Sequence, residues 1–185
     1  LEAFPVAICL AAGTGDQFVW LALWNRLAEL DCDCAGVCRS GSQAVSRSIL
    51  LITTSFPGDK PGAEAAGVFV NDVALELSKS SLVRVVAPGS RESRETSTEG
   101  VEIFRFDAGD RPLSLLSPLR PWHWSRILRT LMSLRRQTLA ANDDGMVGQA
   151  LAFWVLPAGW AASVLKKRDG VPYAVWALGS DIWFL

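Results

Sequence analysis

The chain has 185 residues, half of them hydrophobic and a fifth charged, and its formal net charge is −1. This composition excludes intrinsic disorder, which requires low hydrophobicity and high net charge. The near-neutral charge provides no global positive field, so we expect no nucleic-acid partner. The length fits one domain with an appendage, and the apolar C-terminal end leads us to expect a fragment of a longer protein.

Residues 1–48 lack the regular alternation of apolar runs and amphipathic stretches that begins at residue 49. We expect them to form an N-terminal extension, disordered or helical, that packs poorly on the folded part. It is either a genuine part of the protein or a non-native appendage. All four cysteines lie in it, at Cys9, Cys32, Cys34 and Cys38. Structural zinc sites usually need four ligands, often in paired C-x2-C form. The observed spacing therefore favours reduced thiols, and we expect no metal.

Residues 49–185 alternate between apolar β-branched runs and amphipathic stretches with helical spacing. The patterns predict strands at 49–54, 82–87, 101–106, 147–153 and 173–178, and helices at 63–79, 122–141 and 156–168. Such alternation predicts an α/β, Rossmann-like and mostly parallel sheet with helices on both faces and strand order 3-2-1-4-5. The second strand is expected to stop before Pro88 and Gly89, and the charged residues 90–100 are expected to form a solvated turn.

In this strand order the topological switch point lies between the first and fourth strands, where open α/β sheets bind ligands. The loop from Phe56 to Gly67 joins the first strand to its helix. Glycines and a helix N-terminus suit a diphosphate, which makes Gly62, Ala66 and Gly67 candidates; the alternative is a plain turn. If Gly67 contacts phosphate, a bulky side chain there should lower activity more than stability.

Two further segments follow predicted strands. Gly179, Ser180 and Asp181 come after the fifth strand and suit recognition of a sugar or phosphate, or else a helix N-cap. The stretch from Trp154 to Gly159 follows the fourth strand, and its tryptophan is either a packing residue or a platform for a sugar ring.

Taken together, Ile49–Pro57, Ala66–Leu75, Trp154–Gly159 and Pro172–Ile182 resemble the N-terminal domain of the family-4 retaining glycosyltransferases, which have the GT-B fold. The resemblance covers residues 49–185 and implies an acceptor-side domain, incomplete at its C-terminus. In many members a histidine precedes the Gly-Ser-Asp motif, whereas this chain has Leu178. The catalytic residues are therefore unknown.

The resemblance implies transfer of a sugar, with retention, from a nucleotide-diphosphate sugar to a glycan or lipid-linked acceptor, as in polysaccharide biosynthesis. It implies no cofactor and no metal bound to an Asp-x-Asp motif. Gly62, Ala66 and Gly67 would lie near the diphosphate and Gly179–Asp181 near the sugar, with Phe56, Trp154 and Pro157 on the acceptor side. The missing C-terminal domain of the same chain would complete the cleft, so the fragment alone should be inactive.

The predicted helix at 122–141 begins with a basic, tryptophan-containing segment. Residues 120–136 contain five arginines and no acidic residue, a pattern found in helices that lie on anionic membranes. The alternative function is thus a non-catalytic α/β module that docks on a membrane or partner through residues 120–136. We expect a cytoplasmic protein, either free or peripheral on the inner face of the plasma membrane. The candidate contacts are Arg120, Trp122, Trp124, Arg126, Arg129, Arg135 and Arg136.

Overall fold

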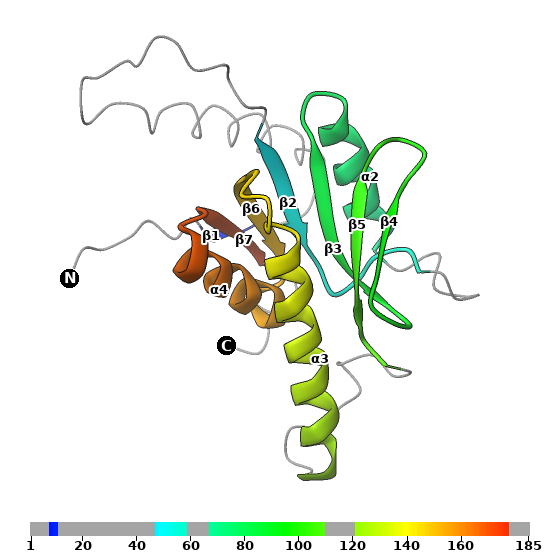
Figure 1. The fold of residues 1–185 in the computed structure, drawn as a ribbon, viewed down its shortest axis with the longest axis vertical. Helices are drawn as coiled ribbons and strands as arrows, with labels where there is room; N and C mark the ends of the chain where they lie inside the picture. The colour runs from blue at the N-terminus through cyan, green and yellow to red at the C-terminus, as the bar shows by residue number, and fades with distance from the viewer. Residues whose placement is uncertain (1–7, 11–46, 59–66, 110–120, 178–185) are drawn as a thin grey trace, which may run out of the picture.

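The computed structural model of the chain describes residues 8–10, 47–58, 67–109 and 121–177 (Figure 1). The strands are β1 (Ile8–Leu10), β2 (Ser48–Ile52), β3 (Val83–Gly89), β4 (Ser93–Thr96), β5 (Glu102–Asp107), β6 (Val147–Phe153) and β7 (Tyr173–Ala177). The helices are α2 (Val68–Ser78), α3 (Pro121–Ala140) and α4 (Trp160–Asp169), and a short irregular turn, η2 (Val155–Gly159), precedes α4. Among these residues no helix is long and apolar enough to cross a membrane.

The strands form one sheet in the order β1-β7-β6-β2-β3-β5-β4. Its five central strands, β5-β3-β2-β6-β7, are the predicted ones in the predicted order 3-2-1-4-5, and neighbouring pairs among them are parallel. The predicted mostly parallel α/β sheet is therefore confirmed. The sequence did not indicate the short strands at the two edges, β1 and β4.

The expectation of a simple solvated turn at residues 90–100 is wrong, because β4 pairs antiparallel with β5. All four β4 residues are exposed, and charged side chains reach across the pair. Arg94 forms an ion pair with Glu102 at 2.8 Å, and Glu95 pairs with Arg105 at 2.7 Å. The guanidinium of Arg94 also lies 4.9 Å from the centre of the Phe104 ring. Ion pairs thus hold a strand that has no apolar alternation.

At the opposite edge, β1 pairs in parallel with β7, from Ile8 beside Val175 to Leu10 beside Ala177. The N-terminal extension therefore adds a three-residue strand at an edge of the sheet and not in its centre. The cysteine-containing residues 32–38 lie outside the described part of the chain. A division at residue 48 stays a prediction.

The predicted end of the second strand before Pro88 is also wrong, because β3 continues through Pro88 and Gly89 beside Phe106 and Asp107 of β5. The last bond from β2 runs from the Thr53 amide to the Val86 carbonyl. Pro88 therefore lies beyond the end of β2, where its missing N–H breaks no ladder bond.

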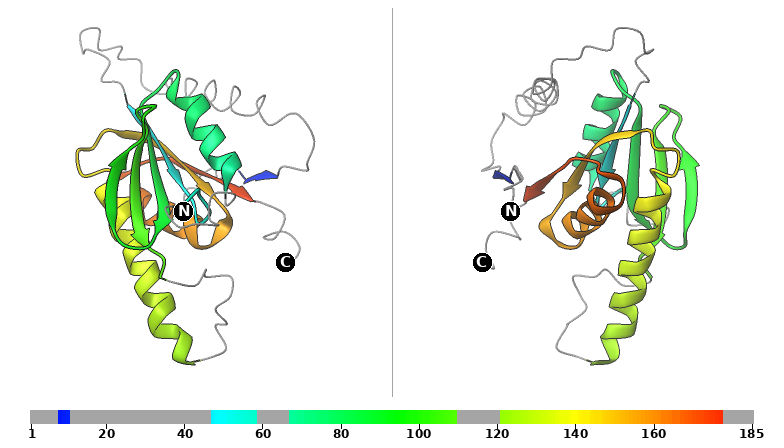
Figure 2. Two further views of the ribbon diagram at one scale, coloured as in Figure 1. Left: turned by 90° about the vertical axis from the view of Figure 1, so that its right-hand side faces the viewer. Right: turned by 60° about the vertical axis from the view of Figure 1, so that its left-hand side comes forward.

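The sheet is covered on both faces, as predicted, with α2 on one face and α3 and α4 on the other (Figure 2). Side chains of β2 alternate between the two layers, as the period of a strand requires. Leu50 and Ile52 belong to the core under α3 and α4, whereas Ile49 and Leu51 belong to the core under α2. Because β2 is buried on both faces, its sequence is a continuous apolar run.

The third predicted helix begins later than expected. Leu156 has φ −126° and ψ 136°, so the chain is extended there and regular helix starts only at Trp160. The following residue, Pro157, disfavours the helical conformation at Leu156 by steric contact. The turn η2 thus remains a distinct feature at the end of β6.

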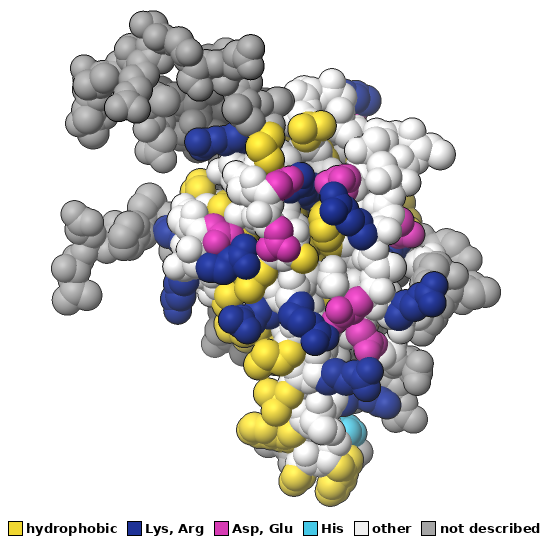
Figure 3. Space-filling view, viewed as in Figure 1, with side chains coloured by type: hydrophobic (Ala, Val, Ile, Leu, Met, Phe, Trp, Pro, Cys, Tyr) yellow, Lys and Arg dark blue, Asp and Glu magenta, His cyan; other side chains and the backbone are white. Residues whose placement is uncertain are grey.

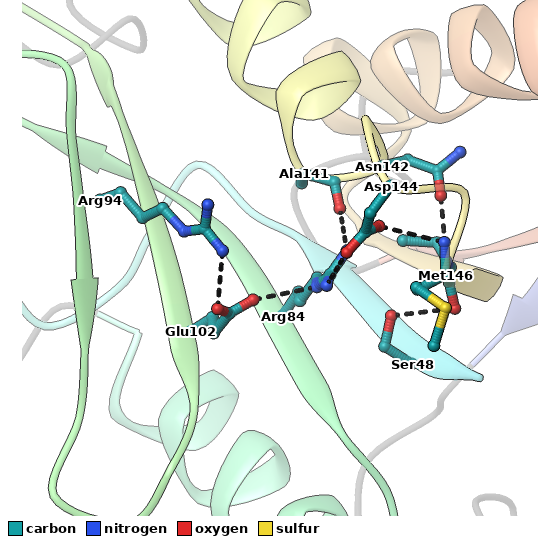
Figure 4. A network of polar contacts seen from close by, with 9 residues as sticks. Ser48, Arg84, Arg94, Glu102, Ala141, Asn142, Asp144 and Met146 are labelled. Atoms are coloured by element: carbon teal, nitrogen blue, oxygen red, sulfur yellow. Dashed lines mark hydrogen bonds and ion pairs between the residues drawn. The ribbon is translucent and has the colours of Figure 1, made fainter. Parts of the chain in front are cut away.

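A polar network ties the C-terminal end of α3 to the amino-terminal ends of the central strands (Figure 4). Arg84 donates to the Ala141 carbonyl at 2.8 Å, binds Asp144 through two nitrogens and pairs with Glu102 at 3.0 Å. The hydrogen bond from Arg84 is the main cause that lowers the pKa of Asp144 to about 2. The network sets the position of α3 along the sheet.

Candidate ligand-binding edge

The loops after β2 and β6 leave the sheet at its carboxyl edge, side by side, because β2 and β6 are neighbours. Their connections diverge from this point, since β3 lies on one side of β2 and β7 on the far side of β6. The predicted switch point is thus present. After β2 the chain turns at Thr53, whose hydroxyl donates to the Ser55 carbonyl at 2.8 Å and accepts from the Ser55 amide at 3.1 Å.

Gly67 joins this loop to α2 at very close range. It caps the helix with φ +67°, a left-handed conformation that favours glycine. A Cβ at this position would lie 2.1 Å from the Ser55 carbonyl oxygen and 2.7 Å from the Phe56 nitrogen. The N-terminus of α2 is therefore packed directly on the backbone of the loop after β2, and its first turn contains no acidic residue.

Arg105 holds the same loop from the other side. This buried arginine donates to the Pro57 carbonyl at 3.0 Å and to the Pro88 carbonyl at 3.1 Å, and it pairs with Glu95. Its guanidinium lies 5.4 Å from the centre of the Phe56 ring. The sequence analysis missed Arg105, although it is a charged residue between the two phenylalanines of β5. Its bonds fix the path of the chain as it leaves β2.

The turn after β6 presents apolar side chains to solvent. Trp154 has φ 73° and ψ 143°, a combination that side-chain-bearing residues rarely adopt. Its amide donates to the Trp176 carbonyl at 3.0 Å, and its carbonyl accepts from the Gly159 amide at 3.2 Å. Beyond it, Val155 and Leu156 are exposed, Leu156 by 72%. A strained backbone that holds apolar side chains in water is typical of a functional position.

A cluster of aromatic residues packs against this turn. Phe153 stacks on Trp176 with ring centres 5.5 Å apart, and Phe69 of α2 makes edge contacts with Phe153 and Trp154. The cluster connects α2, β6 and β7. It therefore links the helix N-terminus on one side of the switch point to the exposed turn on the other.

The predicted site residues fall into two groups. Gly62, Ala66, Gly179, Ser180, Asp181 and Arg120 lie outside the described residues. Of the others, Gly67 packs on the loop after β2, and Trp154 and Pro157 belong to the exposed turn. Phe56 is buried in the core under α2. The structure thus brings Gly67, Trp154 and Pro157 to the same edge of the sheet.

Two cavities lie away from this edge. One of about 420 Å³ lies on the α3 side and is lined by Arg84, Glu92 and Arg94, among others. These charges are paired, because Arg84 and Arg94 bind Glu102 while Glu92 binds Arg136. The other, of about 510 Å³, lies at the amino-terminal ends of β6 and β7. Neither contains the loops of the switch point.

No family model matches the chain, and neither does any curated protein. Among solved structures, it is similar to sucrose-phosphate synthase from Thermosynechococcus elongatus, with a TM-score of 0.51 and 13% sequence identity. The match covers 75% of this chain and 35% of that one. The chain thus spans about a third of the length of that protein. At this identity the likeness shows the fold alone.

Proposed function

We propose that the chain is the acceptor-side part of a glycosyltransferase that transfers a sugar, with retention, from a nucleotide-diphosphate sugar to a glycan or lipid-linked acceptor. The observation that carries this proposal is the similarity of its fold to part of a sucrose-phosphate synthase. The geometry of the carboxyl edge adds support, because a helix N-terminus and an exposed apolar turn flank its switch point.

In this proposal the two sides of the switch point have different roles. The N-terminus of α2 has partial positive charge and free N–H groups, and it has no acidic side chain in its first turn. It would face the donor diphosphate. Gly67 would act indirectly, since its close contact with Ser55 fixes where the helix begins.

The turn after β6 would contact the acceptor. Val155 and Leu156 offer apolar surface of the kind that packs on a sugar ring or a lipid chain. The strained backbone at Trp154 and the aromatic cluster beneath hold this surface in place. A second domain, also part of the proposal, would supply the remaining donor contacts and close the cleft.

The experiment replaces Leu156 with Asn in the protein that includes this second domain. Loss of an apolar contact of about 1.4 kcal/mol would lower kcat/KM for the acceptor about ten-fold. The KM for the nucleotide sugar should stay unchanged. Steady-state transfer of a radiolabelled sugar, with each substrate varied in turn, measures both quantities.

Leu82→Asn is the matched control, because Leu82 is also exposed, by 55%, but precedes β3 at the opposite edge of the sheet. It should leave both kinetic constants unchanged. Equal effects of the two substitutions would contradict the role of the turn after β6. If no sugar is transferred from any nucleotide sugar tested, the proposal that the protein is a glycosyltransferase is wrong.

A further inference from the structure

The first two turns of α3 project beyond the carboxyl edge of the sheet (Figures 1 and 2). Asp107, the last residue of β5, bonds to the third and fourth turns of α3. Its amide donates to Ser133 Oγ at 2.8 Å, and its carboxylate pairs with Arg129 at 3.1 Å. Residues 121–128 therefore extend about 12 Å past the end of β5, given a rise of about 1.5 Å per residue.

Large apolar side chains are exposed along this projecting part and the helical turn that follows it. Trp122 is 71% exposed, Trp124 56%, Leu128 50% and Met132 49%. Trp124, Leu128 and Met132 are spaced four residues apart, so they form one stripe along the helix. Figure 3 shows hydrophobic side chains along the free end of α3, with arginines beside them. Helix faces of this kind normally contact another surface.

Arginines lie along the same helix, and their charges are only partly neutralised. Arg129 pairs with Asp107 and Arg136 pairs with Glu92. Arg126 and Arg135 are exposed and have no acidic partner in the described part of the chain. The whole molecule has a net charge of −1, yet residues 120–136 contain five arginines and no acidic residue. This helix thus carries an excess of positive charge on a molecule that is close to neutral.

We infer that the projecting part of α3, together with the exposed residues of the two turns after it, docks on an anionic membrane surface. Exposed Trp, Leu and Met side chains can enter the boundary between headgroups and acyl chains, while neighbouring arginines bind anionic headgroups. A second copy of the chain fits less well, since two such faces would bring their arginines together. The inference stands independently of the glycosyltransferase proposal, because it rests on α3 alone.

The position of α3 gives this docking a direction. The helix projects on the same side as the turn after β6, since both lie at the carboxyl edge. Binding through α3 would therefore hold that edge toward the lipid surface.

The test is co-sedimentation of the complete 185-residue chain with vesicles of phosphatidylcholine, alone or mixed with phosphatidylglycerol. We expect binding to the mixed vesicles that weakens as salt is added. The double substitution Arg126→Gln and Arg135→Gln should lower the partition coefficient roughly thirty-fold, for two arginines near an anionic surface. Leu128→Gln with Met132→Gln should lower it by about ten-fold or more.

The matched control is Lys79→Gln with Lys167→Gln, which removes the same charge from exposed positions near the amino-terminal ends of the strands. It should bind nearly as well as the unmodified chain. Circular dichroism should show all variants equally folded, because the substituted side chains are exposed. No binding to mixed vesicles, equal binding to pure phosphatidylcholine, or an equal loss in the control would each overturn the inference. Concentration-dependent dimers abolished by Leu128→Gln with Met132→Gln, without vesicle binding, would assign the face to a second copy.

Discussion

Gly67 is the residue at which the backbone geometry is most demanding. It combines a positive φ with an approach to the Ser55–Phe56 peptide that leaves no room for a Cβ. The expectation that a bulky side chain there would lower activity more than stability stays a prediction, but this geometry indicates a clear loss of stability as well. The atoms nearest to a Cβ at this position belong to the backbone of Ser55 and Phe56. No flexible side chain could therefore move aside to make room for it.

We expect Gly67→Ala to destabilise the chain by about 2 kcal/mol or more, as the sum of the left-handed conformation and the steric overlap. Gly100→Ala is the control, since Gly100 has φ +81° but nothing within 4 Å of its would-be Cβ. It should cost only the conformational part, about 1 kcal/mol. Urea unfolding of both variants gives the difference, and equal losses would show that the contact with Ser55 is unimportant.

Arg105 shows why part of the site could not be predicted. In the sequence it occupies an alternating position with Val101 and Ile103, on the face that α2 covers. Burial of an arginine there is costly unless hydrogen bonds compensate it. The compensating carbonyls of Pro57 and Pro88 come from distant segments, so no local pattern reveals them.

At the scale of elements, the corner between α3 and β6 depends on the ion pair of Arg84 and Asp144. The pKa of Asp144 is lowered from 3.8 to about 2 in the folded chain, chiefly by the hydrogen bond from Arg84. A carboxyl whose pKa falls on folding contributes stability above its unfolded pKa, and that contribution is lost as the pH falls through the folded value.

We therefore expect the contribution of Asp144 to be complete above about pH 4 and to disappear toward pH 2. Asp144 is half-exposed, so screening by solvent limits the contribution to about 1 kcal/mol. Asp144→Asn should lose this amount at neutral pH and converge with the unmodified chain in acid. Urea unfolding at several pH values compares the two, and a constant difference down to pH 2 would contradict this account.

The elements differ in how well the sequence predicts them. The five central strands are apolar runs between helical stretches, and their order follows from the handedness of the crossovers. β4 has no apolar alternation, since it is stabilised by pairs such as Arg94 with Glu102. β1 contains only three residues. A strand that is stabilised by cross-strand ion pairs, or that contains only three residues, has no periodic hydrophobic pattern in its sequence.

At the scale of the whole molecule, the proposed chemistry needs two domains. The 185-residue chain alone should therefore transfer no sugar above background, although it is folded. The assay uses radiolabelled nucleotide sugars with the purified chain, and the protein with its downstream domain serves as positive control. If the isolated chain still transfers sugar after further purification, the proposal that transfer needs both domains is wrong.

The two outer strands also affect how the sheet meets other copies of itself while the chain is folding. An unprotected outer strand can recruit a further strand and seed cross-β aggregation. β4 opposes such recruitment, because an added strand would have to accommodate the exposed charges of Arg94 and Glu95. On the other side, β1 pairs with β7 from Val175 to Ala177, and within the residues that the structure describes Tyr173 and Ala174 have no strand partner on this side. Misassembly of partly folded chains should accordingly begin on the β7 side.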